Sequence, residues 1–242
     1  MSAPAVAVLG YHKIGNPPAG CDPTWFYIPE ETFEGQLRCL HEEGLRIIDL
    51  DTFVRGLDAP ETLPDRAALI TFDDGCRSLT GGALRILTSL GFPAVVFVPS
   101  EYIGRTNSFD AGIEPEEPIC GWEDLHRLEK AGVSVQSHSA SHPRLSQLDE
   151  ASQERELLTS KATLETGLRR RVTAFAYPFG DSGADVATMD LLMRSAGYEA
   201  AFLYGGGVVQ PRFADRFHLP RIAMGPDTDL LAELRAAGAS RP

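Results

Sequence analysis

Two neighbouring aspartates at the end of an apolar run are the residues of this chain best suited to chemistry. The segment Thr71-Phe-Asp-Asp-Gly75 follows the apolar residues 67–70, which read as a buried strand. Because burying an unpaired carboxylate is costly, a strand that ends on two aspartates needs something to compensate their charge. A metal ion would compensate one carboxylate, and the second could then act as a base beside it. The alternative is a solvated turn with glycine at positive φ.

Two histidines four residues apart form a second candidate cluster. His138 and His142 follow the β-type residues 132–135, and Pro143 comes directly after the second histidine. A lone histidine is more often an ordinary core or surface residue, but imidazole is also a common ligand for zinc and related ions. A helical turn or a tight loop after the strand would bring both rings to one side. Two histidines with one carboxylate make a recognised ligand set that leaves positions open for water and substrate.

The composition fits a single soluble enzyme domain over residues 1–242. The net charge of −12 argues against nucleic acid and against an anionic membrane surface as partners. No apolar stretch is long enough to span a bilayer, and residues 6–9 are too short a run for a signal-peptide core. The four cysteines contain no CxxC pair, which indicates free thiols in a reducing compartment. We therefore expect a cytoplasmic protein, or a secreted one if a leader was trimmed.

Strand-like and helical segments alternate along the chain, which predicts βαβ units and a parallel sheet with helices outside it. Strands are expected near residues 5–11, 46–49, 67–72, 94–98, 133–136, 173–177, 200–203 and 218–222. Helices are expected over residues 29–43, 78–90, 122–131, 151–168, 184–195 and 228–236. Eight strand candidates indicate a barrel, whose active site would lie at the carboxyl ends of the strands. Both the aspartate pair and the histidine pair fall at such ends.

Residues 101–121 interrupt this alternation. They contain glycine, proline and acidic residues with little periodicity, so we expect an inserted loop. The loop follows a strand end and could form the rim of the active site. A surface excursion without a role in the site is the alternative.

Several segments, in this order, resemble motifs of the polysaccharide deacetylases, the NodB-homology carbohydrate esterases. The main ones are Thr71-Phe-Asp-Asp-Gly75, His138-Ser-Ala-Ser-His142-Pro143 and Phe175-Ala-Tyr-Pro-Phe-Gly180. The early Gly10-Tyr-His-Lys-Ile14 and the late Leu219-Pro-Arg-Ile222 look like one branch of that family. The resemblance spans nearly the whole chain. It implies a distorted (β/α) barrel of about seven parallel strands that uses a divalent metal to hydrolyse N-acetyl groups on amino sugars.

The resemblance also implies roles for individual residues. Asp74, His138 and His142 would hold the metal, most often zinc, with Co²⁺, Ni²⁺ or Mn²⁺ as other candidates. Asp73 would be the general base that takes a proton from water at the metal. The substrate would be an N-acylated amino sugar or its polymer or conjugate.

The third motif departs from the family pattern. The family usually has Arg-Pro-Pro-Tyr where this chain has Ala176-Tyr-Pro-Phe179. The backbone N–H of Phe179 would face the developing oxyanion, so losing the tyrosine side chain there matters little. Tyr177 is the motif's other candidate for the substrate and oxyanion site. The missing arginine at Ala176 matters more, because that arginine normally orients the base.

The fifth motif departs as well. The family usually has Leu-x-His with the histidine as general acid, whereas Leu219-Pro-Arg221 ends on an arginine. Arginine stays protonated and cannot serve as the acid. In some relatives with shuffled motifs an early Tyr-His pair supplies it, and His12, with an intrinsic pKa of roughly 6.5, would suit that role. Otherwise His12 is a structural residue at a strand end. Arg221 would orient Asp73 in place of the arginine that is missing at Ala176, and Leu219 would line the pocket for the acetyl methyl group.

Three other functions stay open at this point. A deformylase of a lipid-linked sugar, or a hydrolase of cyclic amides, would use the same metal motif. A carbohydrate-binding relative without catalysis would explain the altered third and fifth motifs, although it need not retain all four metal and base residues. A phosphoryl-transfer enzyme is less well supported, because the chain has no glycine-rich phosphate loop with a lysine.

Overall fold

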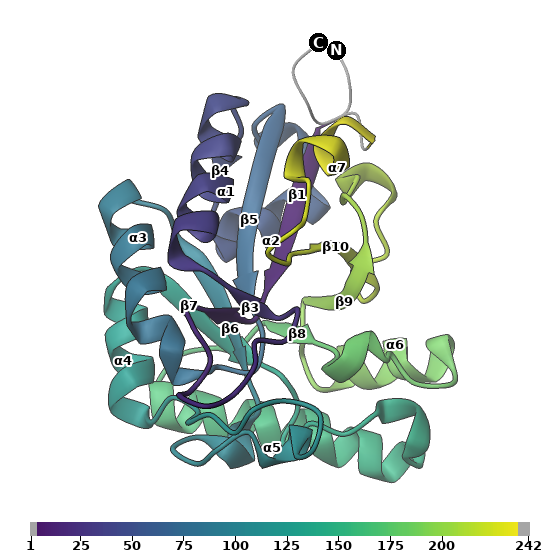
Figure 1. Ribbon diagram of the computed structural model, residues 1–242. Coiled ribbons are helices and arrows are strands. Elements are labelled where there is room, and N and C mark those ends of the chain that lie inside the picture. Colours follow the sequence, from purple (N-terminus) through teal and green to yellow (C-terminus); the bar gives the residue numbers. More distant parts are fainter. Residues whose placement is uncertain (1–3, 237–242) are drawn as a thin grey trace.

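Seven parallel strands close into a barrel in the computed structural model, which describes residues 4–236 (Figure 1). The barrel closes because β1 pairs with β10 on one side and with β5 on the other. The strands are β1 (Ala5–Tyr11), β5 (Arg66–Phe72), β6 (Ala94–Val98), β7 (Val133–Ser137), β8 (Ala174–Ala176), β9 (Ala200–Gly206) and β10 (Leu219–Ala223). The short β4 (Arg46–Ile47) pairs beside the start of β5. The predicted distorted (β/α) barrel is confirmed.

Alternate residues of each strand face two different hydrophobic cores. In β1, Val6 and Val8 belong to the core inside the barrel, whereas Ala7 and Leu9 belong to the core between strands and helices. This burial on both faces is why the strands read as continuous apolar runs rather than alternating ones. The same alternation decides which side chains at the strand ends reach the barrel axis.

The six predicted helices are present around the barrel. They are α1 (Glu30–Glu42), α3 (Gly82–Leu90), α4 (Trp122–Lys130), α5 (Glu150–Leu168), α6 (Val186–Ser195) and α7 (Leu230–Ala236). The sequence reading missed α2 (Leu50–Asp58), which begins where the side chain of Asp49 accepts a hydrogen bond from the Thr52 N–H at 2.7 Å. It also missed the two-residue strands β2 (Lys13–Ile14) and β3 (Tyr27–Ile28), which pair with each other. Within residues 4–236 no helix is both long and apolar enough to cross a bilayer.

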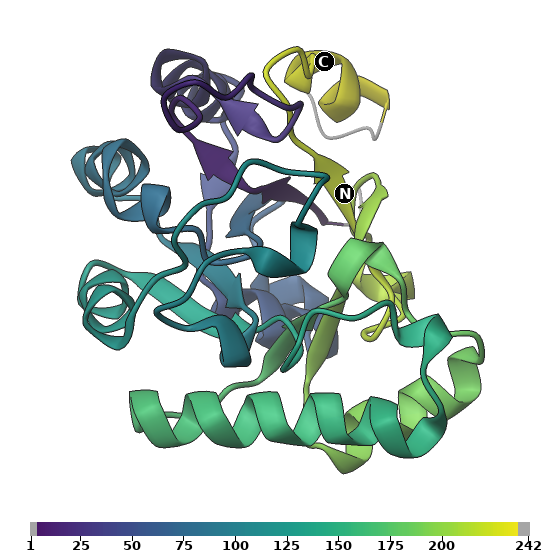
Figure 2. The same ribbon diagram turned by 60° about the horizontal axis from the view of Figure 1, so that its bottom comes forward.

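The inserted segment 101–121 runs across the barrel mouth, where the carboxyl ends of the strands meet (Figure 2, teal). It is anchored beside the aspartate motif, because the Cys120 N–H donates to the Gly75 carbonyl at 2.9 Å and the Arg77 N–H donates to the Pro118 carbonyl at 2.8 Å. The segment therefore forms part of the rim of the barrel mouth rather than a surface excursion.

Candidate active site

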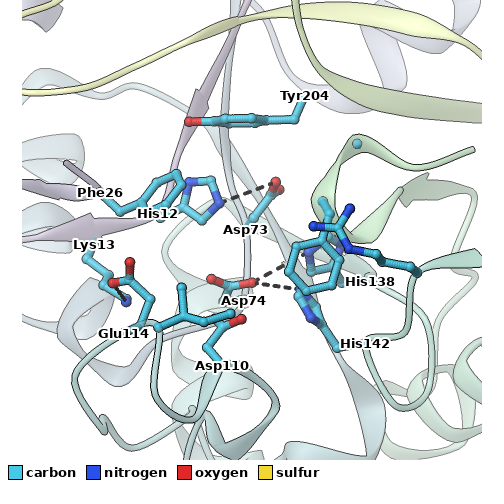
Figure 3. Close-up of a pocket in the computed structure, with 14 residues that line it drawn as sticks. His12, Lys13, Phe26, Asp73, Asp74, Asp110, Glu114, His138, His142 and Tyr204 are labelled. Atoms are coloured by element: carbon cyan, nitrogen blue, oxygen red, sulfur yellow. Dashed lines mark hydrogen bonds and ion pairs between the residues drawn. The ribbon is translucent and has the colours of Figure 1, made fainter. Parts of the chain in front are cut away.

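The candidate catalytic and metal-ligand residues converge on one cavity of about 290 Å³ at the barrel mouth (Figure 3). His12 follows β1, Asp73 and Asp74 follow β5, and His138 and His142 follow β7. All five line the cavity. They reach it because parallel strands bring all their carboxyl ends to the same end of the barrel.

Asp74, His138 and His142 form a compact set of metal-ligand atoms. Oδ1 of Asp74 lies 3.5 Å from Nε2 of His138 and 3.3 Å from Nε2 of His142. Nδ1 of His138 lies 2.7 Å from the Ala176 carbonyl, so this nitrogen carries the proton and Nε2 keeps a free lone pair. Burial would raise the pKa of Asp74, but the two histidines hold it well below its usual value. These donor types and spacings fit a divalent cation.

A tight loop, rather than a helical turn, holds the two histidine rings together, with their centroids 4.8 Å apart. Glu156 of α5 organises this loop: its carboxylate accepts hydrogen bonds from the N–H groups of Ala140 and Ser141 at 2.9 and 2.8 Å. The hydroxyl of Ser139 accepts the N–H of His142 at 2.9 Å. The position of His142 is therefore fixed by a hydrogen bond within its own loop.

Backbone strain is concentrated at this site. Within residues 4–236, five non-glycine residues have a positive φ, and four of them belong to the motifs at the cavity: Asp74, Ser139, His142 and Phe179. Such a conformation costs about 1–3 kcal/mol and persists only where the surroundings enforce it. Such strain is typical of functional sites, and here it falls on two of the three metal-ligand candidates.

Asp73 lies beside this set but is held by a different partner. Arg221 of β10 donates from Nη1 to Oδ1 at 2.8 Å and from Nη2 to Oδ2 at 2.6 Å, and the guanidinium is fully buried. Burial would raise the pKa of Asp73, but the guanidinium outweighs that effect and lowers it. The structure thus brings Arg221 to Asp73 from β10, two strands away from β8, where the family's usual arginine position is occupied by Ala176.

Arg221 is itself fixed by its surroundings. Its Nε donates to the Leu203 carbonyl at 2.6 Å, and its guanidinium lies 5.6 Å from the centre of the Tyr204 ring. Gly10 leaves room for this arrangement, because a Cβ there would lie 3.2 Å from the Tyr204 ring and 3.6 Å from the guanidinium carbon. A bidentate pair fixed in this way sets the orientation of the carboxylate as well as its charge.

His12 also lies beside Asp73. Its Nε2 lies 4.0 Å from Oδ2 of Asp73, and its ring packs against Phe26 and Tyr204 at centroid distances of 4.4 and 5.0 Å. Its Nδ1 is buried and has no hydrogen-bond partner in the protein. Burial lowers the pKa of His12, against the opposing effect of Asp74 and Asp73. The ring is therefore in reach of a group bound in the cavity.

The three remaining predicted residues lie in different places. Phe179 lines the cavity, with the Arg144 guanidinium 4.3 Å from its ring centre. Tyr177 is fully buried and points away, because its ring stacks on His218 in the outer core. Leu219 is buried inside the barrel and is not among the residues that line the cavity. The expected contact of Leu219 with an acetyl methyl group is therefore not what the structure shows.

Sequence reasoning missed the acidic side of the cavity. Asp110 and Glu114 of the inserted segment line it together with Lys13, and Nζ of Lys13 lies 2.6 Å from Oε2 of Glu114. Burial raises the pKa of Asp110 to about 7, with a further contribution from Asp74. The only available signal was that Lys13 adjoins His12 in sequence. A loop of irregular structure gives no periodicity that could place its carboxylates.

Replacing Glu114 with alanine is expected to destabilise the protein by about 3–5 kcal/mol, because the Lys13 ammonium would be left buried without its partner. Urea unfolding monitored by circular dichroism measures this. Glu116→Ala, which removes an exposed glutamate from the same segment, is the matched control and should change stability by less than about 0.5 kcal/mol. Equal effects of the two substitutions would show that the ion pair does not hold the segment in place.

Comparison with known proteins identifies the family. The sequence model of the polysaccharide deacetylase family matches residues 61–201, which is more than half of the chain and includes both the aspartate and the histidine motifs. The chain belongs to the polysaccharide deacetylase family. A curated relative, the protein YxkH of Bacillus subtilis (strain 168), is 24% identical over 173 residues, covering 72% of this chain and 56% of YxkH. The chain thus spans little more than half the length of that relative.

Solved structures share the fold of this family member. Streptococcus pyogenes deacetylase PplD in complex with acetate matches with a TM-score of 0.81 at 20% identity, and the match covers 100% of each chain. IcaB from Ammonifex degensii matches with a TM-score of 0.79 at 23% identity, covering 98% of this chain and 97% of IcaB. At these identities the likeness shows a common fold.

Proposed function

We propose that this protein is a metal-dependent hydrolase that removes N-acetyl groups from an amino sugar or its polymer. One observation carries the proposal: a carboxylate fixed by a buried arginine adjoins a compact set of one aspartate and two histidines in a single cavity. Family membership supports the reaction class. Acetate in the PplD complex is a property of that protein, and it supports acetate as the acid released here.

In this proposal Asp74, His138 and His142 hold the metal. A divalent ion at this position would act as a Lewis acid that activates water and polarises an amide carbonyl. Zinc suits two imidazoles and one carboxylate best, although Co²⁺, Ni²⁺ and Mn²⁺ also accept such ligands.

Asp73 acts as the general base. Its two oxygens accept hydrogen bonds from Arg221, and a carboxylate oxygen has further lone-pair positions for a proton from water. Arg221 is a positioning residue, because it holds the carboxylate ionised and correctly oriented. The backbone N–H of Phe179, presented by a strained positive-φ residue at the cavity, would stabilise the developing oxyanion.

His12 acts as the general acid that protonates the departing amine. Because burial lowers the pKa of His12, the neutral ring predominates at neutral pH and must gain its proton before it donates. Asp73 lies 4.0 Å from its Nε2, so the proton that the base takes from water can pass to the histidine, which gives it to the departing amine and returns to its neutral form. Because Nδ1 of His12 is buried without a partner, no hydrogen bond within the protein competes for this ring nitrogen.

Replacing His12 with alanine is therefore expected to lower kcat by about 10²- to 10⁴-fold while leaving metal content unchanged. His126→Ala, on the outer helix α4, is the matched control and should be fully active. Steady-state acetate release measures both. Full activity of the His12 variant would remove the general-acid assignment but leave the metal and base assignments standing.

The proposed function is tested by product release from defined substrates. The protein is incubated with N-acetylglucosamine oligomers and with acetylated sugar conjugates, and acetate and formate are quantified separately. We expect acetate release that a chelator abolishes and that added zinc restores. Formate release from N-formyl sugars alone would point to a deformylase. Inertness toward every substrate after metal is restored would favour a carbohydrate-binding protein.

A further inference from the structure

A second cluster of metal-ligand atoms lies outside the barrel, away from the active-site cavity. It comprises Asp190 of α6, Asp215 of the loop before β10, and His218, which directly precedes that strand. None of the three lines the cavity. Figure 1 shows α6 at the edge of the molecule, beside the lower end of β8 and β9. The cluster therefore cannot serve the reaction described above.

The spacing of these atoms matches that of the active-site set. Nδ1 of His218 lies 3.0 Å from Oδ2 of Asp215 and 3.6 Å from Oδ1 of Asp190. The corresponding distances around Asp74 are 3.3 and 3.5 Å. In both clusters the three ligand atoms lie within 4.8 Å of one another. Ligands that share an ion at about 2.1 Å stand roughly this far apart.

The negative charge of the cluster is not balanced by the surrounding side chains. Among the residues that the structure describes, neither Asp190 nor Asp215 forms an ion pair with a lysine or arginine. The neighbouring Arg216 pairs with Asp58 instead, and Arg194 lies over the Phe217 ring. Two carboxylates thus face one imidazole, and the Asp190 carboxylate, which is the more buried of the two, would gain from a compensating charge.

Three buried polar atoms in this cluster also lack a hydrogen-bond partner in the protein. They are Oδ1 of Asp190, Nε2 of His218 and the hydroxyl of Tyr177. Tyr177 is fully buried, and its ring stacks on His218 with centroids 6.0 Å apart and planes 19° apart. Burial first, and then the carboxylates of Asp190 and Asp215, raise the pKa of this hydroxyl. Unpaired buried polar groups are costly, and a cation held by the two carboxylates and Nδ1 of His218 would supply the partner that Oδ1 of Asp190 lacks.

We propose that Asp190, Asp215 and His218 bind a second divalent cation, with the Tyr177 hydroxyl beside it. One imidazole nitrogen and two carboxylate oxygens suit a borderline ion such as Zn²⁺ or Mn²⁺. Bound there, the ion would join α6 to the loop before β10 and hold both against the outer core. This site is structural, and it stands or falls independently of the proposed deacetylase activity.

Metal stoichiometry tests this proposal. The full-length protein is stripped with chelator, dialysed against Zn²⁺ or, separately, Mn²⁺, and analysed by mass spectrometry for metal per chain. We expect two zinc ions in the wild type, one in Asp215→Asn and one in His142→Ala. The double variant should bind none. Asp65→Asn, which removes an exposed carboxylate outside both clusters, is the matched control and should keep two.

Each outcome decides between the two sites. Because the Asp215 side chain is half exposed, Asp215→Asn should fold normally, and its acetate release should match the wild type. One metal ion per wild-type chain, lost in His142→Ala and kept in Asp215→Asn, would overturn the second site and leave the proposed function intact. Two ions retained in Asp215→Asn would also overturn it. One metal ion per wild-type chain that is kept in His142→Ala and lost in Asp215→Asn would instead count against the proposed function.

Discussion

Replacing Asp73 with asparagine is expected to lower kcat/KM for acetate release by about 10²- to 10⁴-fold, the range that a general base contributes. Asparagine keeps the shape of the side chain and can still accept a hydrogen bond from Arg221, but its amide cannot take a proton from water. Because Asp73 is not among the proposed ligands, the metal content should match that of the wild type. Steady-state kinetics and metal analysis on the same preparation measure both quantities.

The comparison with Asp74→Asn makes this experiment specific. That variant should lose activity together with its active-site metal, because Oδ1 of Asp74 faces both histidines. Two adjacent aspartates would thus give two different phenotypes, one with metal and one without. Loss of metal from the Asp73 variant would show that the two roles are assigned the wrong way round.

Replacing Arg221 with methionine is expected to reduce the free energy of unfolding by about 3–5 kcal/mol, because it leaves a buried carboxylate without its cation. Asp73 is almost completely buried, and both of its oxygens bond to this guanidinium. Activity should fall as well, since the base would lose its orientation. Urea unfolding and acetate release measure the two effects.

Two controls separate charge from packing at this position. The double variant Asp73→Asn/Arg221→Met should be more stable than Arg221→Met alone, because the unpaired charge is gone.

The destabilisation caused by Arg221→Met should also depend on pH. Since Arg221 lowers the pKa of Asp73, the pair stabilises the protein above the unfolded-state value of about 3.9, and this contribution is lost as the pH falls through the lower folded-state value. Equal destabilisation at pH 7 and pH 3 would contradict a charge-based role.

Much of the barrel could be predicted from the sequence because its strands are buried on both faces and separated by helices of ordinary length. The nine-residue helix α2 escaped prediction because it is short and begins directly after the expected strand over residues 46–49, in a stretch to which no element was assigned. The two-residue strands β2 and β3 carry no periodicity at all. Their pairing depends on contacts between distant segments.

The candidate site was predictable where its residues directly follow regular strands. Asp74 and His138 come just after strands, and His142 lies in the loop that follows β7. The pairing of Arg221 with Asp73 depends instead on β1 pairing with both β10, which contains Arg221, and β5, which Asp73 follows. The alternation of side chains along β8 could have shown that Tyr177 does not face the cavity. Ala174 and Ala176 face the barrel interior, so Phe175 and Tyr177 must face the helices. Leu219 belongs to the core inside the barrel and does not reach the cavity.

The acidic side of the cavity could not be predicted in this way. Asp110 and Glu114 reach it from a segment whose course depends on bonds to distant residues, such as those of Glu114 with Lys13 and Thr24. An irregular loop has no repeat from which the direction of a side chain follows. Only the three-dimensional structure brings these carboxylates to the cavity.

The location of the active-site metal is the most direct test of the account. Crystals of the zinc-loaded protein would be measured on both sides of the zinc absorption edge, and the anomalous signal would be mapped. The account predicts a zinc peak bonded to Oδ1 of Asp74 and to Nε2 of His138 and His142, with Asp73 still paired to Arg221 and outside the coordination sphere. An absent peak in fully loaded crystals, or a zinc ion bonded to Asp73 in place of Asp74, would contradict it.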